Sequence, residues 1–276
     1  MCLERTVTYA AVLALFLTLP LGWLLIHVPR DLWSCWLMRR CVSVDRRAYI
    51  VVLAHIALAL AYTTPWDNYL LAKGVWFYDP QRVSNIVLGY VPLEEYSFFV
   101  LQSLLTGLWT LMVRRHLKVA EKPDMTASHL RLWSSLGVFV LWAAAVAVWI
   151  SGWKPGTYLA LILGWGLIPV LIQIAFGADI LWTQRRLLAV AIFVPTVYLW
   201  LMDWFAISHG VWQLDPLQTT GLALGGLPLE EMLFFLLTNW IIGCGVVLML
   251  SETSYTRAQA LRQYGQMRWW QFRSSS

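Results

Sequence analysis

The sequence has little charge and few cysteines, and both shortages limit what the protein can be. Charged residues make up 13% of its 276 residues, against about 25% in typical soluble domains. Hydrophobic residues make up 59%, and the mean hydropathy is +0.63. The four cysteines form no CxxC pair and no zinc-type spacing, so neither a disulfide framework nor a metal site is indicated. We therefore expect an all-α polytopic membrane protein.

Other absences exclude particular classes. No lysine follows Lys154, whereas a seven-span retinal protein needs a Schiff-base lysine in its last span. Residues 66–69 do not supply the clustered aspartates that a membrane prenyltransferase uses for magnesium and diphosphate. No GxGxxG follows a strand, so no dinucleotide fold is predicted, and no basic-aromatic patch suggests nucleic acid. His55 falls on Ala191 in the repeat described below, which excludes a duplicated metal site.

Two copies of Pro-Leu-Glu-Glu stand out, at 92–95 and 228–231. They put Glu94, Glu95, Glu230 and Glu231 into apolar runs at 86–113 and 221–250. A charge at the bilayer centre costs about 2.5–3.5 kcal/mol on insertion scales. In the simpler interpretation each proline begins a helix whose first-turn glutamates complement its dipole. That explains one glutamate well, but it explains two pairs poorly, so we predict a functional role.

The two copies belong to a longer internal repeat. A displacement of 136 positions aligns more than thirty residues without a gap. Both copies have the same 12-residue spacing between two aspartates. The coinciding residues include Asp67 with Asp203, 74–76 with 210–212, Asp79-Pro80 with Asp215-Pro216, Gly89 with Gly225, and Phe98-Phe99 with Phe234-Phe235. The chain is therefore an internal duplication, and we expect its site to be duplicated too.

Seven spans are predicted, with an aromatic, turn-rich segment at 66–82. Of the 20 Lys and Arg residues, 16 fall in the loops after spans one, three and five and in the tail. The positive-inside rule then places the N-terminus outside and the C-terminus in the cytoplasm of a cell-membrane protein. The tail from Thr256 is expected to be partly disordered or surface-bound. The spans are 7–27, 48–65, 86–113, 132–150, 157–176, 187–207 and 221–250.

The repeat is displaced by four spans, so its two copies run in the same direction through the membrane. The span at 132–150 has no counterpart and restores this parity, which gives a parallel 3+1+3 architecture. We expect a first repeat at 1–118, a linker with the extra helix at 119–156, a second repeat at 157–252 and a basic tail at 253–276. Both glutamate pairs then lie toward the outer leaflet.

Helical spacing places Glu95 on one face with Phe99 and Gln102, and Glu231 with Phe235 and Thr238. Asp-Pro at 79–80 and 215–216 is more typical of a turn than of a catalyst. Asp67 and Asp203 lie at the ends of their spans. A position at the membrane–water interface and a role in the site are equal alternatives for both residues. Tryptophan is the best cation–π partner. The candidate substrate-binding residues are Asp67, Asp203, Trp76, Trp212, Phe98, Phe99, Gln102, Phe234, Phe235 and Thr238.

The chain resembles the membrane-integral lycopene cyclases of the bacterial heterodimeric type, which also occur as archaeal and fungal domains. The matching segments are 92–99 (Pro-Leu-Glu-Glu-Tyr-Ser-Phe-Phe) and 227–235 (Leu-Pro-Leu-Glu-Glu-Met-Leu-Phe-Phe). The resemblance covers nearly the whole chain, with both halves fused. It implies closure of the open ends of lycopene to rings without the flavin domain of unrelated cyclases.

The residues suit that chemistry. Cyclisation adds a proton to a terminal double bond, closes the ring through a cation, and removes a proton from a neighbouring carbon. Buried carboxyl groups serve as acid and base, and aromatic faces shelter the cation. We therefore predict Glu94, Glu95, Glu230 and Glu231 as the acid–base residues of one shared pocket. A two-ring product then requires the half-cyclised molecule to leave and re-enter by its other end.

The expected partners are a lipophilic carotenoid and the bilayer, with no cofactor, metal or nucleic acid. Contact with other carotenoid-pathway enzymes or with a second copy of the chain is a further expectation. Two other functions fit the same features. Parallel repeats and intramembrane carboxylates also suit a proton-coupled transporter, and the glutamates suit a structural role in a carotenoid-binding or assembly protein.

Overall fold

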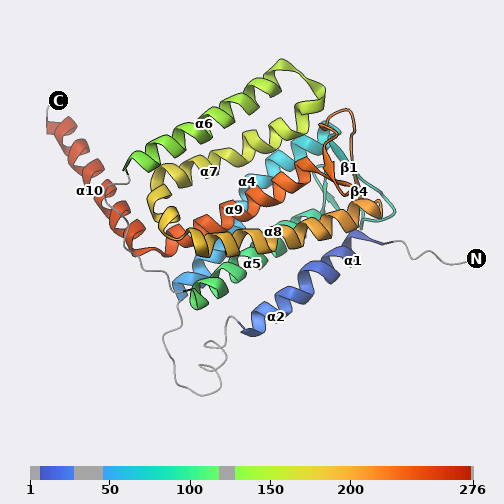
Figure 1. Ribbon diagram of the computed structural model, residues 1–276, viewed down its shortest axis with the longest axis horizontal. Coiled ribbons are helices and arrows are strands. Elements are labelled where there is room, and N and C mark those ends of the chain that lie inside the picture. The colour runs from blue at the N-terminus through green and yellow to red at the C-terminus, as the bar shows by residue number, and fades with distance from the viewer. Residues whose placement is uncertain (1–6, 28–45, 118–127, 275–276) are drawn as a thin grey trace, which may run out of the picture.

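The computed structural model describes residues 7–27, 46–117 and 128–274 of the chain (Figure 1). Within that part, seven helices are long and apolar enough to cross a membrane. This confirms the all-α polytopic class. Much of the predicted basic loops after spans one and three lies outside the described residues. The seven spans are Tyr9–His27, Arg46–Ala72, Leu93–His116, Ser128–Ser151, Lys154–Thr183, Arg185–Ser208 and Leu229–Leu250.

The first span consists of α1 (Tyr9–Leu13), a wider π turn η1 (Ala14–Thr18) and α2 (Leu19–His27). The Thr8 hydroxyl accepts a hydrogen bond from the N–H of Ala11 at 3.3 Å and so caps the N-terminus of α1. One face of the span is buried against the bundle, which fixes Tyr9 inside the molecule.

The second span continues beyond its predicted end at Pro65. Helix α4 (Arg46–Ala72) carries this proline in its interior, a position that membrane helices tolerate. Asp67 is therefore inside a helix and fully buried. Asp203 is equally buried in α8 (Arg185–Ser208), so neither carboxylate is exposed to solvent.

Helices α5 (Leu93–His116) and α9 (Leu229–Leu250) begin later than predicted. Before each lies a short hairpin, β2 (Val87–Leu88) with β3 (Val91–Pro92) and β5 (Ala223–Leu224) with β6 (Leu227–Pro228). The turns use glycines with positive φ: +71° at Gly89, +60° at Gly225 and +93° at Gly226. Such turns suit two-residue hairpins. The residues predicted to begin spans three and seven therefore form apolar hairpins that precede the helices.

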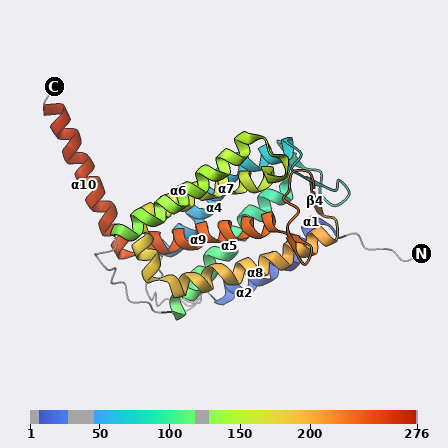
Figure 2. The ribbon, with the colours of Figure 1, turned by 45° about the horizontal axis from the view of Figure 1, so that its top comes forward.

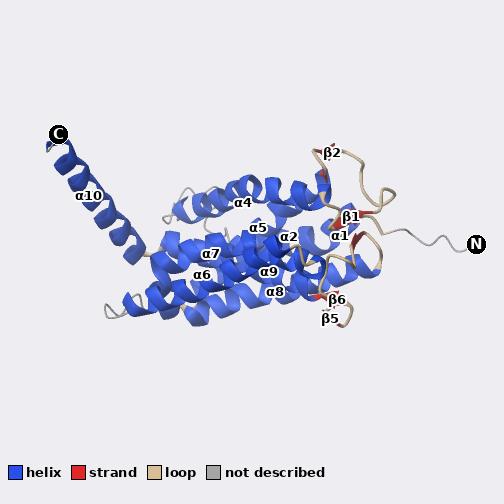
Figure 3. Ribbon diagram, turned by 90° about the horizontal axis from the view of Figure 1, so that it is seen from above, coloured by secondary structure: helices blue, strands red, loops and turns tan. Residues whose placement is uncertain are grey.

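A third small sheet joins the two halves. Strand β1 (Trp76–Tyr78) pairs antiparallel with β4 (Trp212–Leu214), and Phe77 lies opposite Gln213. The N–H of Asp79 donates to the Val211 carbonyl, and the N–H of Asp215 donates to the Val75 carbonyl. Equivalent residues of the repeat therefore exchange equivalent hydrogen bonds. All three sheets lie at one end of the helical bundle (Figure 3).

Helices α5 and α9 form the buried centre, with α4 beside α5 and α8 beside α9. Helix α6 (Ser128–Ser151) packs against α7 (Thr157–Thr183) at the edge of the bundle (Figure 2). A short turn η2 (Lys154–Gly156) connects these two helices. Helix α10 (Glu252–Ser274) begins at the end opposite the strands and then projects away (Figure 1). The tail, expected to be partly disordered or surface-bound, is thus helical as far as Ser274.

Candidate active site

The second glutamate of each pair faces the centre of the molecule. Glu95 and Glu231 are 4% and 2% exposed, and they are close enough for their charges to interact. Glu95 Oε2 accepts hydrogen bonds from the hydroxyls of Tyr9 at 2.5 Å and Tyr78 at 2.8 Å. Glu231 Oε1 accepts from the Tyr158 hydroxyl at 2.6 Å. One carboxyl group from each half therefore meets at one buried position.

The first glutamate of each pair faces the loop that precedes its hairpin. Glu94 accepts from the N–H and hydroxyl of Ser84, at 2.5 and 2.9 Å. Glu230 accepts from the N–H and hydroxyl of Thr220, at 2.6 and 2.8 Å. Both glutamates also lie in the first turn of a helix that begins after proline. The geometry therefore places Glu94 and Glu230 in the support of the loops and Glu95 and Glu231 in the shared centre.

Asp67 and Asp203 lie beside this centre but differ in their contacts. Asp203 Oδ1 accepts a hydrogen bond from Trp212 Nε1 at 2.9 Å. Neither carboxylate oxygen of Asp67 has a hydrogen-bond partner among the described residues. The same holds for Nε1 of Trp76, the repeat equivalent of Trp212. Asp67 lies within Coulomb range of both Glu95 and Glu231. Asp67 and Trp76 thus have buried polar atoms without hydrogen-bond partners beside the site. Asp203 and Trp212 share this feature only in part, because they hydrogen-bond to each other.

Aromatic rings from both halves surround the carboxyl groups. The Tyr9 ring lies 4.9 Å from Trp212 and 5.9 Å from Tyr78, and the Trp76 ring lies 6.0 Å from Tyr158. Each half thus contributes one tyrosine that packs on a tryptophan of the other half. Ring faces stabilise a nearby cation electrostatically, so this arrangement suits a reaction that passes through a carbocation.

The Asp-Pro motifs form turns, as predicted. Asp79 accepts from the N–H of Gln81 at 2.9 Å and from Arg82 Nε at 3.0 Å. Asp215 accepts from Gln218 Nε2 at 2.9 Å and from the N–H of Leu217 at 3.0 Å. The Gln81 hydrogen bond is the main cause of a lowered pKa at Asp79, and the Gln218 hydrogen bond is the main cause at Asp215. Both carboxylates therefore stabilise exposed turns.

Beyond the carboxyl groups, polar and aromatic residues from the two halves of the repeat contact each other. Gln102 Nε2 donates to Oγ1 of Thr238, its exact repeat equivalent, at 2.7 Å. The Phe98 ring meets the Phe235 ring edge-on at 6.0 Å. Phe99 and Phe234 flank this pair. The predicted inward face shared by α5 and α9 is therefore present in the structure.

A cavity of about 960 Å³ runs along the bundle beside this centre. Its walls come from α4 and α7 and its floor from α9 and α5. At the near end lie Phe99 and Phe234, one helical turn beyond Glu95 and Glu231, and Gln102 and Thr238, about two turns beyond them. The rim residues Ile50, Leu58, Ile168 and Ile172 are exposed. The cavity is therefore an apolar groove that opens sideways, toward the lipid in a membrane.

Aromatic residues line the near end of the groove. The Trp66 and Trp165 rings stack at 4.6 Å, and the Phe234 ring stacks on both. The Tyr62 hydroxyl donates to the Trp165 carbonyl at 2.9 Å, and Trp66 Nε1 donates to the Leu161 carbonyl at 3.1 Å. These two hydrogen bonds hold α4 against α7 at the near end of the groove.

The three tyrosines Tyr9, Tyr78 and Tyr158 were not among the residues predicted from the sequence. Tyr9 and Tyr158 are structural equivalents, since their N–H groups donate to Arg82 and Gln218, which are repeat partners. A comparison at a single displacement does not align them, because the loop after the first span is longer than the one after the fifth. Tyr78 has Leu214 at its repeat position. Burial, and then the charge of Glu95, raise the pKa of Tyr78 well above its ordinary value, so its hydroxyl stays a donor.

Comparison with known families agrees with this geometry. The family model described as Lycopene cyclase matches residues 6–113 and 155–248. The matched segments contain both glutamate pairs, and the unmatched segment between them contains α6. The chain belongs to the lycopene cyclase family. No solved structure matches it significantly.

Individual relatives come from archaea and fungi. The lycopene beta-cyclase of Halobacterium salinarum is 39% identical over 193 residues, covering 70% of this chain and 79% of that protein. The bifunctional lycopene cyclase/phytoene synthase of Gibberella fujikuroi is 32% identical over 241 residues, covering 83% of this chain and 38% of that protein. The Phycomyces blakesleeanus protein of the same name is 34% identical over 224 residues, covering 79% and 35%. This chain therefore spans only about a third of the two fungal proteins.

Proposed function

We propose that this protein is a lycopene cyclase that closes the terminal rings of an acyclic carotenoid by proton transfer alone. The observation that carries the proposal is the meeting of Glu95 and Glu231, one from each repeat, in a buried site lined with aromatic rings. Family membership supports the same activity. The enzyme is a flavin-independent isomerase, because the proton added to one carbon is balanced by a proton lost from another.

Glu95 and Glu231 serve as the acid–base pair. One carboxyl group donates a proton to the terminal double bond, the second double bond attacks the resulting cation, and a carboxylate removes a proton from a neighbouring ring carbon. Coupled carboxyl groups in a buried site readily hold one proton between them. The hydroxyls of Tyr9, Tyr78 and Tyr158 orient these carboxyl groups, and Trp76 and Trp212 shelter the cation.

The groove holds the rest of the polyene. On α4 its lining runs from Arg47 to Thr63, which corresponds to about 24 Å at 1.5 Å per residue. One further helical turn, about 5 Å, separates its near end from the carboxyl groups. The total is close to the ~30 Å thickness of the hydrocarbon core, which an extended carotenoid roughly matches in length. The exposed apolar rim provides sideways entry from the bilayer, where such a substrate dissolves.

The protein is a cell-membrane enzyme in this proposal, with its N-terminus outside and its C-terminus in the cytoplasm. The distribution of Lys and Arg supports this orientation. The hairpin end of the bundle, with both glutamate pairs, then lies on the outer side. Glu95 and Glu231 serve a single pocket, so one molecule of substrate is cyclised at one end at a time.

Expression in cells that accumulate lycopene, followed by pigment chromatography, tests the proposal. A cyclase converts lycopene to products with one or two rings. A carotenoid-binding protein retains unchanged lycopene, and a proton-coupled transporter leaves the pigments unaltered. Unchanged lycopene in cells whose membranes contain the full-length protein would contradict the proposal.

A further inference from the structure

The far end of the groove is formed by the first turns of α10. Ser254, Tyr255 and Ala258 line the cavity there, together with Met249 at the end of α9. Ala258 is exposed toward the open groove. The start of α10 therefore marks the far end of the space available to a substrate chain.

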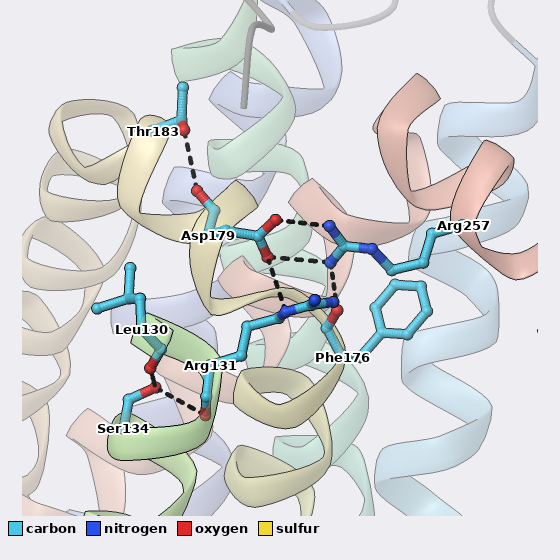
Figure 4. Close-up of polar contacts among 7 residues, drawn as sticks. All are labelled: Leu130, Arg131, Ser134, Phe176, Asp179, Thr183 and Arg257. Atoms are coloured by element: carbon cyan, nitrogen blue, oxygen red, sulfur yellow. Dashed lines mark hydrogen bonds and ion pairs between the residues drawn. The ribbon is translucent and has the colours of Figure 1, made fainter. Parts of the chain in front are cut away.

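Helix α10 is anchored to one wall of the groove through Arg257 (Figure 4). The guanidinium binds both carboxylate oxygens of Asp179, at 3.0 and 2.5 Å, and donates to the Phe176 carbonyl. Asp179 is 7% exposed, and Arg131 of α6 approaches it at 3.9 Å. A two-point contact between a guanidinium and a buried carboxylate fixes orientation as well as position.

The chain path of α7 makes this anchor possible. Gly177 has non-helical φ and ψ of −150° and 31°, so α7 bends there. A Cβ at this position would lie 2.5 Å from a methyl carbon of Leu248 in α9, so a glycine allows the close approach. The bend sets Phe176 and Asp179, on either side of Gly177, against Arg257.

The opposite wall is joined to α10 through Arg47 of α4. Arg47 Nη2 donates to the Met249 carbonyl at 2.9 Å. Its guanidinium also lies over the Tyr255 ring, 5.7 Å from the centroid. Both walls of the groove therefore hold the first turns of α10 in place, and Ala258 is presented by a helix with a defined position.

We propose that this α10 end determines whether the enzyme forms a second ring, with Ala258 as the specificity-determining residue. The inference rests on the proposed function. Because both carboxyl groups lie at the near end, a substrate that presents one end to them has its other end at α10. In the first reaction that distal end is open and slender. In the second reaction it carries the ring already formed, and the small side chain of Ala258 leaves the room that this ring needs.

Initial rates of ring formation on two substrates test the proposal. The full-length enzyme, reconstituted in bilayers, is given either an acyclic carotenoid or its isolated monocyclic product. The variant Ala258→Phe fills the far end, while Ala260→Phe adds the same side chain at an exposed position of α10 that does not line the groove. Ala258→Val is a milder step that keeps a measurable rate if the larger residue removes all activity.

We expect wild type to act on both substrates. Ala258→Phe is expected to lower the rate on the monocyclic substrate, relative to the acyclic one, by about tenfold or more. Ala258→Val shifts the ratio in the same direction, and Ala260→Phe leaves it unchanged. An unchanged ratio in both Ala258 variants would overturn the inference, and so would a wild type inactive on the monocyclic substrate alone. A wild type inactive on the acyclic substrate would instead reject the proposed function.

Discussion

Substitution by glutamine is expected to have different effects at the two glutamates of each Pro-Leu-Glu-Glu motif. At the first glutamate it lowers stability, and at the second it lowers activity. Glu94→Gln keeps one acceptor oxygen for Ser84 but removes the charge that strengthens the hydrogen bonds to its N–H and hydroxyl. Hydrogen bonds to charged groups contribute about 1.5–3 kcal/mol each. A partial loss of about 1–2 kcal/mol would lower the melting temperature by about 2–8 °C.

Glu95→Gln has a different expected effect. The amide oxygen of glutamine still accepts from the hydroxyls of Tyr9 and Tyr78. Removing a charge that is costly to bury offsets the weaker hydrogen bonds at this position, so the melting temperature stays close to that of wild type. Proton transfer to or from this position is lost, and general acid–base catalysis contributes about 10²–10⁴-fold. We therefore expect ring formation to fall by that factor in Glu95→Gln, and by less than tenfold in Glu94→Gln.

Both quantities are measured on purified protein in detergent or bilayers: the melting temperature by thermal unfolding and the rate by chromatography of carotenoid products. The rates are compared at a temperature where every variant is folded. Glu230→Gln and Glu231→Gln repeat the comparison in the second half of the chain. The reasoning would be refuted if Glu94→Gln, while folded, lost as much activity as Glu95→Gln.

Three further predictions follow from the same geometry. A reporter fused after Ser276 is expected in the cytoplasm and one inserted near Asp79 outside, and a cytoplasmic signal at Asp79 would disprove the orientation. Tyr158→Phe is expected to lower ring formation about tenfold and Tyr9→Phe to lower it less, because Glu95 keeps the Tyr78 hydroxyl; equal rates for wild type and Tyr158→Phe would argue against a positioning role. In a pulse–chase experiment the monocyclic product is expected to appear first, to leave the enzyme, and to be outcompeted by added acyclic substrate, whereas rings that always appear in pairs would contradict a single pocket.

The repeat was the most informative feature of the sequence. The displacement of 136 residues located both glutamate pairs, and it led to the inward face on which Gln102 and Thr238 now form a hydrogen bond. Pattern alone did not separate Glu94 from Glu95, because adjacent residues share one motif while their side chains point in different directions. That difference depends on the loop before each hairpin, where Ser84 and Thr220 provide the partners.

Element boundaries were less predictable. Pro65 suggested the end of a span, but membrane helices tolerate proline in their interior, and this helix continues past Asp67. The apolar hairpins before α5 and α9 have the composition of a membrane span. Their glycines with positive φ, such as Gly89, distinguish them only once the backbone is known. The groove depends on how α4 and α7 diverge, which no local pattern encodes.

The central claim is that Glu95 and Glu231 act as one catalytic unit, and a double-mutant comparison tests it most directly. The rate of first-ring formation is measured for Glu95→Gln, Glu231→Gln and the double variant. Residues that act as a unit are strongly non-additive, so each single variant should lose about 10²–10⁴-fold and the double variant little more. If instead each single variant kept about half of the wild-type rate and only the double variant lost it, two independent sites would be present and the account would be wrong.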